Sequence, residues 1–106
     1  MVRKPKPNQH PADLVLQNHN KITDLLKIIS HAARLIILCL LAKKEMTAGE
    51  LNEHVPLSQS AVSQHLAVLR SNGLVTTRRD ALTIFYKLTD EDLKETIESL
   101  YDVFCR

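Results

Sequence analysis

Residues 47–75 read TAGELNEHVPLSQSAVSQHLAVLRSNGLV, and the helix signals in this stretch decide the fold. Thr47 and Glu50 have the spacing of a capping box, in which each side chain bonds the other residue's backbone N–H. This pattern predicts a short helix over residues 48–54. Pro56 ends it, because proline disfavours helical geometry in the residue before it.

A second helix is predicted directly after this break. Ser58 is a favoured N-cap residue, and Gly73 suits a C-terminal stop, so the helix runs from Gln59 to about Asn72. Three apolar residues recur at helical spacing and form its predicted inward face: Val62, Leu66 and Leu69. Two short helices joined by a tight turn are the skeleton of a helix-turn-helix.

Two longer helices are predicted before this pair. The first spans roughly Ala12 to Ile29, and the second runs from His31 to about Lys43, with Ser30 as its cap. The interior of the second is apolar on all sides, which is typical of a helix buried in a core or at a dimer seam. Residues 1–11 hold three prolines and no apolar periodicity, so they are predicted to be a flexible basic arm.

A hairpin and a last helix are predicted after the pair. The strands are Val75–Arg79 and Thr83–Leu88, with Ile84, Tyr86 and Leu88 on one buried face. The helix spans about Asp90–Phe104, with Thr89 as its cap. It carries one apolar stripe: Leu93, Ile97, Leu100, Tyr101 and Phe104. The expected fold is mainly α with a small β-hairpin, and residues 12–106 form one domain.

Composition and charge narrow the class of protein. The longest apolar run, Leu35–Ala42, is far shorter than the roughly 20 residues of a membrane span, so we expect a cytoplasmic protein without a membrane partner. Residues 1–42 carry six basic and two acidic residues, whereas residues 90–106 carry two basic and six acidic ones. The acidic C-terminal segment is therefore expected to face away from any polyanion.

The second helix of the pair carries the pattern of a DNA-reading surface. Its N-terminal half presents four polar residues outward: Gln59, Ser60, Ser63 and Gln64. Recognition helices use their N-terminal residues on base edges, and Gln pairs well with adenine. Arg78 and Arg79 lie near the hairpin tip, within reach of phosphates or a minor groove. Taken alone, the polar face of the helix and the two arginines could each be ordinary solvent-exposed surface instead of a DNA contact.

Two other classes explain less of the sequence. A module that binds only protein accounts for the apolar stripe of the last helix but not for the Ser and Gln face. An enzyme needs a nucleophile with a base, and pairing Cys39 or Cys105 with His65 suggests no pocket or oxyanion site. We therefore expect no enzyme and no cofactor.

The stretch SQSAVSQHLAVLR at residues 58–70, followed by NGLV at 72–75, resembles the ArsR/SmtB family of repressors. The hairpin segments TRRDA at 77–81 and FYKL at 85–88 are similar to that family's wing. The resemblance covers residues 12–105 and implies a winged helix-turn-helix of about five helices and a two-stranded wing. It also implies a homodimer joined by its first and last helices. Such a dimer binds double-stranded DNA at an inverted-repeat operator and releases it on sensing a ligand.

The resemblance also allows the family's metal sites to be tested. One subgroup places cysteines on the third helix, where residues 50–55 hold none. Another uses Asp and His on the last helix, where Asp90 and Asp92 are present but no histidine follows His65. No metal site is therefore expected, and His65 is assigned to packing or a phosphate contact with DNA.

The two cysteines remain as candidates for sensing. Cys39 alone in an apolar helix is typical of an inert core residue, whereas Cys105 beside Arg106 is expected to be exposed. One cysteine in the second helix and one ending the last is the arrangement of the family's HlyU, BigR and SqrR type sensors of reactive sulfur. The resemblance implies a disulfide or sulfur-extended bridge between Cys39 and Cys105 that lowers DNA affinity. The alternative is a metal-responsive repressor with the cysteines as ligands or as structural residues only.

Overall fold

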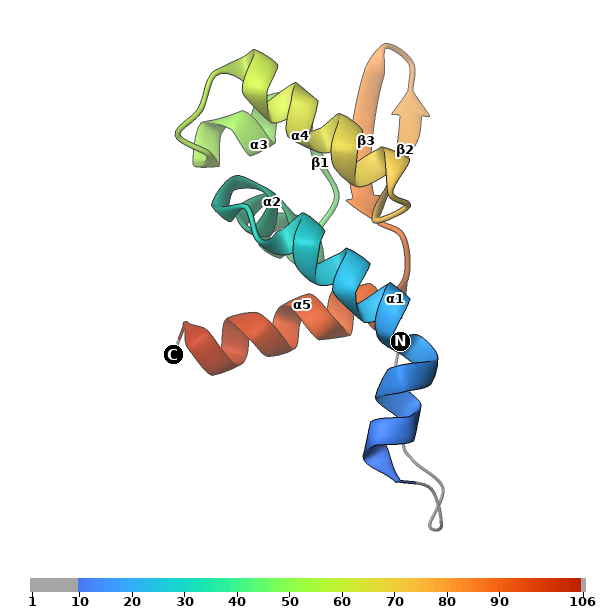
Figure 1. The fold of residues 1–106 in the computed structure, drawn as a ribbon. Coiled ribbons are helices and arrows are strands. Elements are labelled where there is room, and N and C mark those ends of the chain that lie inside the picture. The colour runs from blue at the N-terminus through green and yellow to red at the C-terminus, as the bar shows by residue number, and fades with distance from the viewer. Residues whose placement is uncertain (1–9, 106) are drawn as a thin grey trace.

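The computed structural model describes residues 10–105, and within them it contains five helices and three strands. In chain order these are α1 (Pro11–Ile29), α2 (Ala32–Lys43), β1 (Met46–Thr47), α3 (Ala48–His54), α4 (Gln59–Ser71), β2 (Val75–Asp80), β3 (Thr83–Leu88) and α5 (Glu91–Phe104). Figure 1 shows α3 and α4 on one side of α2, α5 on the other, and the β2–β3 hairpin projecting beside α4. The predicted winged helix-turn-helix is confirmed.

One hydrophobic core joins all five helices to the base of the sheet. Helix α2 contributes four of its buried side chains and packs against α1, α4, α5 and β3. The predicted inward face of α4 is confirmed, because Val62, Leu66 and Leu69 are at most 1% exposed. The remaining core members come from the other elements and their turns: Leu25, Met46, Leu51, Val55, Val75, Leu93 and Ile97.

Side-chain hydrogen bonds hold both the start of α3 and the turn that joins it to α4. The predicted capping box is present: the Glu50 N–H donates to Thr47 Oγ1, and the Thr47 N–H donates to Glu50 Oε1, both at 3.1 Å. The Asn52 amide donates to the Leu57 carbonyl, and Val55 is buried in the core. The contacts of Asn52 and Val55 hold the turn against the body of the domain just before α4 begins.

The wing is a three-stranded antiparallel sheet in the order β1-β3-β2, one strand more than predicted. The short strand β1 pairs Met46 with Tyr86, and its two residues are too few to give a sequence pattern. The β2–β3 turn places Ala81 at a φ of +55°, a left-handed conformation that costs energy for a residue with a Cβ.

Several boundary predictions are corrected. Ser30 does not cap α2; it ends α1, where its hydroxyl donates to the Lys27 carbonyl. Thr89 does not cap α5 either, since Asp90 accepts from the Leu93 N–H and the Thr89 hydroxyl donates to the Gly73 carbonyl. The carboxylate of Asp90 caps α5, whereas α2 begins after His31 without a side-chain cap hydrogen bond.

The apolar faces of β3 and α5 are only partly buried, whereas the sequence predicted one continuous apolar face on each. On β3, Tyr86 and Leu88 pack against the core, but Ile84 is exposed, because the hairpin extends beyond the body of the domain. On α5, the stripe divides: Leu93 and Ile97 are buried inside the single chain, whereas Tyr101 and Phe104 are 44% and 79% exposed. A dimer seam therefore does not need to cover the first half of α5.

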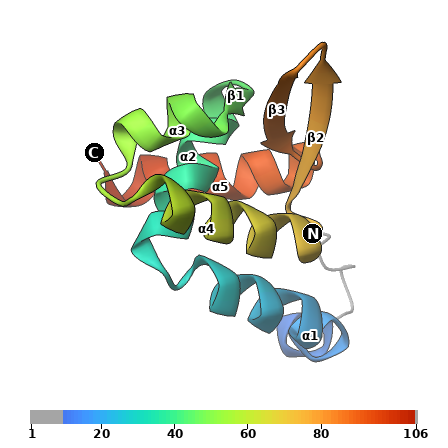
Figure 2. The same ribbon diagram turned by 90° about the horizontal axis from the view of Figure 1, so that it is seen from above.

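Helix α1 reaches beyond the compact body. Figure 1 shows its N-terminal half projecting away from the other elements, and Figure 2 shows α1 and α3 on opposite sides of α4. Helix α1 begins at Pro11, one residue earlier than predicted, as suits a proline in a first helical turn. The rest of the predicted flexible arm lies outside the described residues, apart from His10, which caps α1 through its Nδ1.

No helix among residues 10–105 is by itself long and apolar enough to span a membrane. Only α1 and α2 taken together meet those criteria of length and composition, and the two helices meet at a bend of 103°.

We expect Leu66→Ala to lower the free energy of unfolding by about 2–5 kcal/mol, because it leaves a cavity under α4 where Leu66 is 1% exposed. The matched control is Leu82→Ala at the wing tip, where the side chain is 94% exposed and the expected change is below about 0.5 kcal/mol. Urea unfolding at one protein concentration measures both. Equal losses in the two variants would contradict the described core.

Candidate functional site

The N-terminal half of α4 presents the polar face predicted from the sequence. Gln59, Ser60, Ser63 and Gln64 are all exposed. The Ser58 hydroxyl accepts from the Ala61 N–H and lies 3.2 Å from the Ser60 hydroxyl. Ser60 is therefore held against the helix cap, whereas the other three side chains are exposed along the first turns of the helix. Figure 1 shows this end of α4 on the outer side of the molecule, away from α5.

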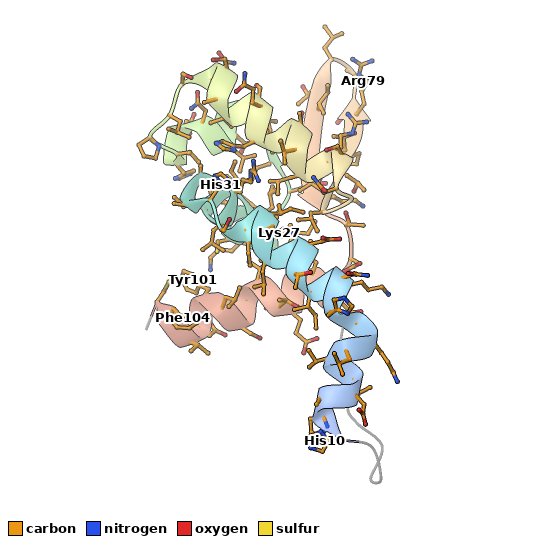
Figure 3. The ribbon with its side chains drawn as sticks, in the orientation of Figure 1. His10, Lys27, His31, Arg79, Tyr101 and Phe104 are labelled. Carbon is orange, nitrogen blue, oxygen red and sulfur yellow. The ribbon has the colours of Figure 1, made fainter. Side chains whose placement is uncertain are left out.

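His65 takes a different position from these residues. It is half-buried and faces α2, where Arg34 Nε donates to its Nδ1 at 3.3 Å. Its ring centroid lies 6.4 Å from that of His31, which begins α2 (Figure 3). Burial lowers the pKa of His65, and the charges of Arg34 and His31 lower it further. This geometry favours the packing role weighed for His65, and a contact with DNA stays a prediction.

The two arginines of the wing differ in how far other side chains hold them in place. Arg78 forms a bidentate ion pair with Glu45, and its guanidinium lies 4.4 Å from the centroid of the Phe85 ring. The hydrogen bond from Arg78 lowers the pKa of Glu45. Arg79 is exposed and points outward from the wing in Figure 3. The structure therefore leaves Arg79 better placed than Arg78 to meet a phosphate.

The two cysteines lie on helices that pack together. Cys39 is half-buried on α2, Cys105 is exposed at the C-cap of α5, and both are free thiols. Burial raises the pKa of Cys39, the charge of Cys105 raises it further, and Lys43 opposes both. Arg106 lies outside the described residues.

Within residues 10–105, no three His, Cys, Asp or Glu side chains gather in a way that would hold a metal ion. Asp90 caps α5, and the two histidines of the α2–α4 contact have a guanidinium beside them. A cation is disfavoured at that point by the neighbouring positive charge.

Sequence reasoning missed the residues that hold the site together. Arg34 binds His65 across 31 positions, and Glu45 binds Arg78 across 33. Lys43 lies 5.3 Å from the centroid of the Tyr101 ring, on the other helix of the cysteine pair. No local spacing signals such pairs, because each joins elements that meet only in the folded chain.

Comparison with known proteins agrees with this geometry. Residues 31–77 match the family described as bacterial regulatory protein, arsR family. The transcriptional activator HlyU of Vibrio cholerae is 47% identical over 90 residues, which cover 85% of this chain and 83% of that protein. The structure of reduced HlyU from Vibrio cholerae is similar, with a TM-score of 0.80 and 46% identity over 87% of this chain and 97% of that one. The transcriptional repressor BigR from Xylella fastidiosa has a TM-score of 0.84 and 36% identity, over 92% of this chain and 99% of that one.

The fold and the outward face of α4 define a winged helix-turn-helix transcription regulator of the DNA-binding class, and its relatives are regulators rather than enzymes. The chain belongs to the ArsR family.

We expect the wild-type chain to lose stability more steeply than His65→Gln as the pH falls from about 7.5 to 5.5. The pKa of His65 is lowered in the folded chain, so the unfolded chain binds a proton first as the pH falls through the usual histidine range near about 6.5. Stability linked to neutral His65 is therefore complete above that range and is lost below it. Urea unfolding across this interval measures the effect, and identical pH profiles for the two proteins would refute it.

Proposed function

We propose that this chain is a thiol-sensing transcription regulator whose homodimer binds an inverted-repeat operator in the cytoplasm. Its affinity for the operator falls when Cys39 and Cys105 are joined by a disulfide or a sulfur-extended bridge. The observation that supports the sensing half is that the two free thiols lie on α2 and at the end of α5, two helices that pack together and are joined by the contact of Lys43 with Tyr101.

The proposed DNA contacts are the outward residues of α4 and the wing. Gln59, Ser63 and Gln64 project from the helix start, the part of a recognition helix that enters the major groove. Ser60 contributes beside the helix cap, and His65 is the member of the set turned furthest towards the protein. Arg79 at the wing supplies a phosphate or minor-groove contact, and Arg78 adds charge from its pair with Glu45.

A homodimer is supported by the apolar surface at the two ends of the fold. Tyr101, Val103 and Phe104 are 44%, 56% and 79% exposed near the end of α5, and Val15 and Leu16 are exposed on the projecting part of α1. Neighbouring exposed apolar side chains of this size favour burial against a second copy. Two-fold symmetry then sets two recognition helices one turn of DNA apart, about 34 Å.

The bridge would act on DNA binding through α2. This helix carries Cys39, packs on α5, and holds His65 of α4 through Arg34. A covalent tie between α2 and the end of α5 changes how these helices pack, and α4 is in direct contact with α2. The two recognition helices of the dimer then no longer match both half-sites. HlyU is named an activator and BigR a repressor, so loss of binding can lower or raise transcription.

We expect Gln59→Ala and Gln64→Ala each to reduce discrimination between operator and unrelated DNA by about 1–3 kcal/mol, because each loses a bidentate base contact. The matched control is Gln17→Ala, which removes an exposed glutamine from α1. The operator is selected from genomic fragments by gel shift, and anisotropy titrations then give the affinities. A Gln59/Gln64 double variant with wild-type affinity and selectivity would show that α4 is not the recognition helix.

We expect polysulfide to lower operator affinity about 5–150-fold, the usual range of allosteric coupling, and a reductant to restore it. Cys39→Ser and Cys105→Ser should each bind the operator when reduced and should not respond. Peptide mapping should find a cross-link between the two cysteines of one chain in the treated wild type. Treated protein with no cross-link and unchanged affinity would remove the sensing half of the proposal and leave the DNA-binding half standing.

A further inference from the structure

A lysine and a tyrosine lie one helical turn from the two cysteines. Lys43 follows Cys39 by four residues on α2, and Tyr101 precedes Cys105 by four residues at the end of α5. The Cys105 N–H donates to the Tyr101 carbonyl at 2.8 Å, so helical geometry extends to that cysteine. Residues four apart share one helix face. The contact between Lys43 and Tyr101, at 5.3 Å, therefore joins the two helices beside the thiol pair.

The charge of Lys43 matters at this seam because α5 is strongly acidic. On α5 itself, the ammonium of Lys94 forms an ion pair with the carboxylate of Glu98 at 3.9 Å. The remaining carboxylates of the helix are those of Glu91, Asp92, Glu95 and Asp102. Glu98 and Asp102 lie within two turns of Cys105, so an anionic reagent that approaches this end of α5 meets negative charge, and Lys43 supplies positive charge from α2. The same ammonium lowers the pKa of Cys39 against the effects of burial and Cys105.

Lys43 is positioned and still accessible. Both Lys43 and Tyr101 are exposed, and Figure 3 shows Tyr101 on the side of α5 that faces α2. The ring face attracts the ammonium and limits its motion. The ring occupies one side of the ammonium, which has three N–H donors, so donors on its other side stay available for an anion.

We propose that Lys43 is a specificity-determining residue that favours anionic sulfur donors, such as inorganic polysulfide, at the Cys39–Cys105 pair. This inference rests on the proposed function. The reaction brings together a thiolate and a polysulfide anion, which repel each other, and a nearby ammonium offsets that repulsion. A neutral oxidant gains no such help, so Lys43 should change the relative rates of charged and neutral reagents.

The chemistry is two thiol–disulfide exchanges. Water takes the proton of the first thiol, and the thiolate attacks a sulfur of the polysulfide. One S–S bond forms, one S–S bond of the reagent breaks, and a shorter polysulfide anion leaves with the electron pair. Water takes the proton of the second thiol, and its thiolate attacks the Sγ atom of the first cysteine. An S–S bond between the two cysteines forms, the bond from that Sγ to its outer sulfur breaks, and the outer sulfur takes a proton and leaves as hydrosulfide with the electron pair. Two thiols are oxidised, and the polysulfide is reduced.

The test measures how fast Cys39 reacts with two aromatic disulfides in a Cys105→Ser background. Dithiobis-nitrobenzoate is a dianion, and dithiodipyridine is neutral. Both react with the same thiolate, so the ratio of their rates cancels any change in the pKa of Cys39. We expect Lys43→Met to lower the dianion-to-neutral ratio about 3–10-fold at low salt, and Lys43→Arg to keep it. Added salt should lower the ratio in the Lys43 protein, because it screens the same attraction.

Lys44→Met is the matched control, since it removes an equal charge from the next residue. The charge of Lys44 acts on Glu50 at the start of α3, and we expect no change in the ratio. An unchanged ratio in Lys43→Met, an equal fall in Lys44→Met, or a salt-independent ratio with Lys43 present would each overturn the inference. A wild-type chain that forms no bridge with polysulfide would overturn the proposed function instead.

Discussion

The burial of α2 is the constraint on which the rest of the structure depends. The middle of this helix is apolar on nearly every side. Its side chains are removed from water because α1, α4, α5 and β3 all pack around it. That packing sets where α4 lies and holds α5 against α2, where Lys43 contacts Tyr101. The surface proposed to meet DNA and the helix that carries Cys39 are therefore both positioned by the packing around α2.

Local signals in the sequence predict the helix-turn-helix well. They do not predict contacts between residues that are far apart in the chain. The capping box at Thr47, the Ser58 cap and the stop at Gly73 lie within one or two turns of the residues they control, so spacing alone reveals them. Ser30 and Thr89 failed as caps because His31 and Asp90 took the N-cap positions. Strand β1 depends on its partner β3 across the fold and leaves no period of its own.

The site shows the same division. The outward face of α4 follows from its helical period, so its residues were identified from the sequence. The direction in which each side chain points, and the partner that it binds, do not follow from that period. His65 is turned towards Arg34, and Arg78 towards Glu45, by residues more than thirty positions away. These contacts replace freely rotating side chains with oriented ones, which lowers the entropy lost if the surface binds a rigid partner.

The order of the strands has a further consequence for how the protein behaves when it is crowded. Strand β3 is paired on both sides, and β1 is only two residues long, so β2 offers the long open edge of the sheet. An open edge can recruit a strand from another chain and start aggregation, and charged residues discourage this. Strand β2 ends in Arg78, Arg79 and Asp80. The two arginines proposed to contact DNA therefore also discourage the open edge of the wing from pairing with strands of neighbouring molecules.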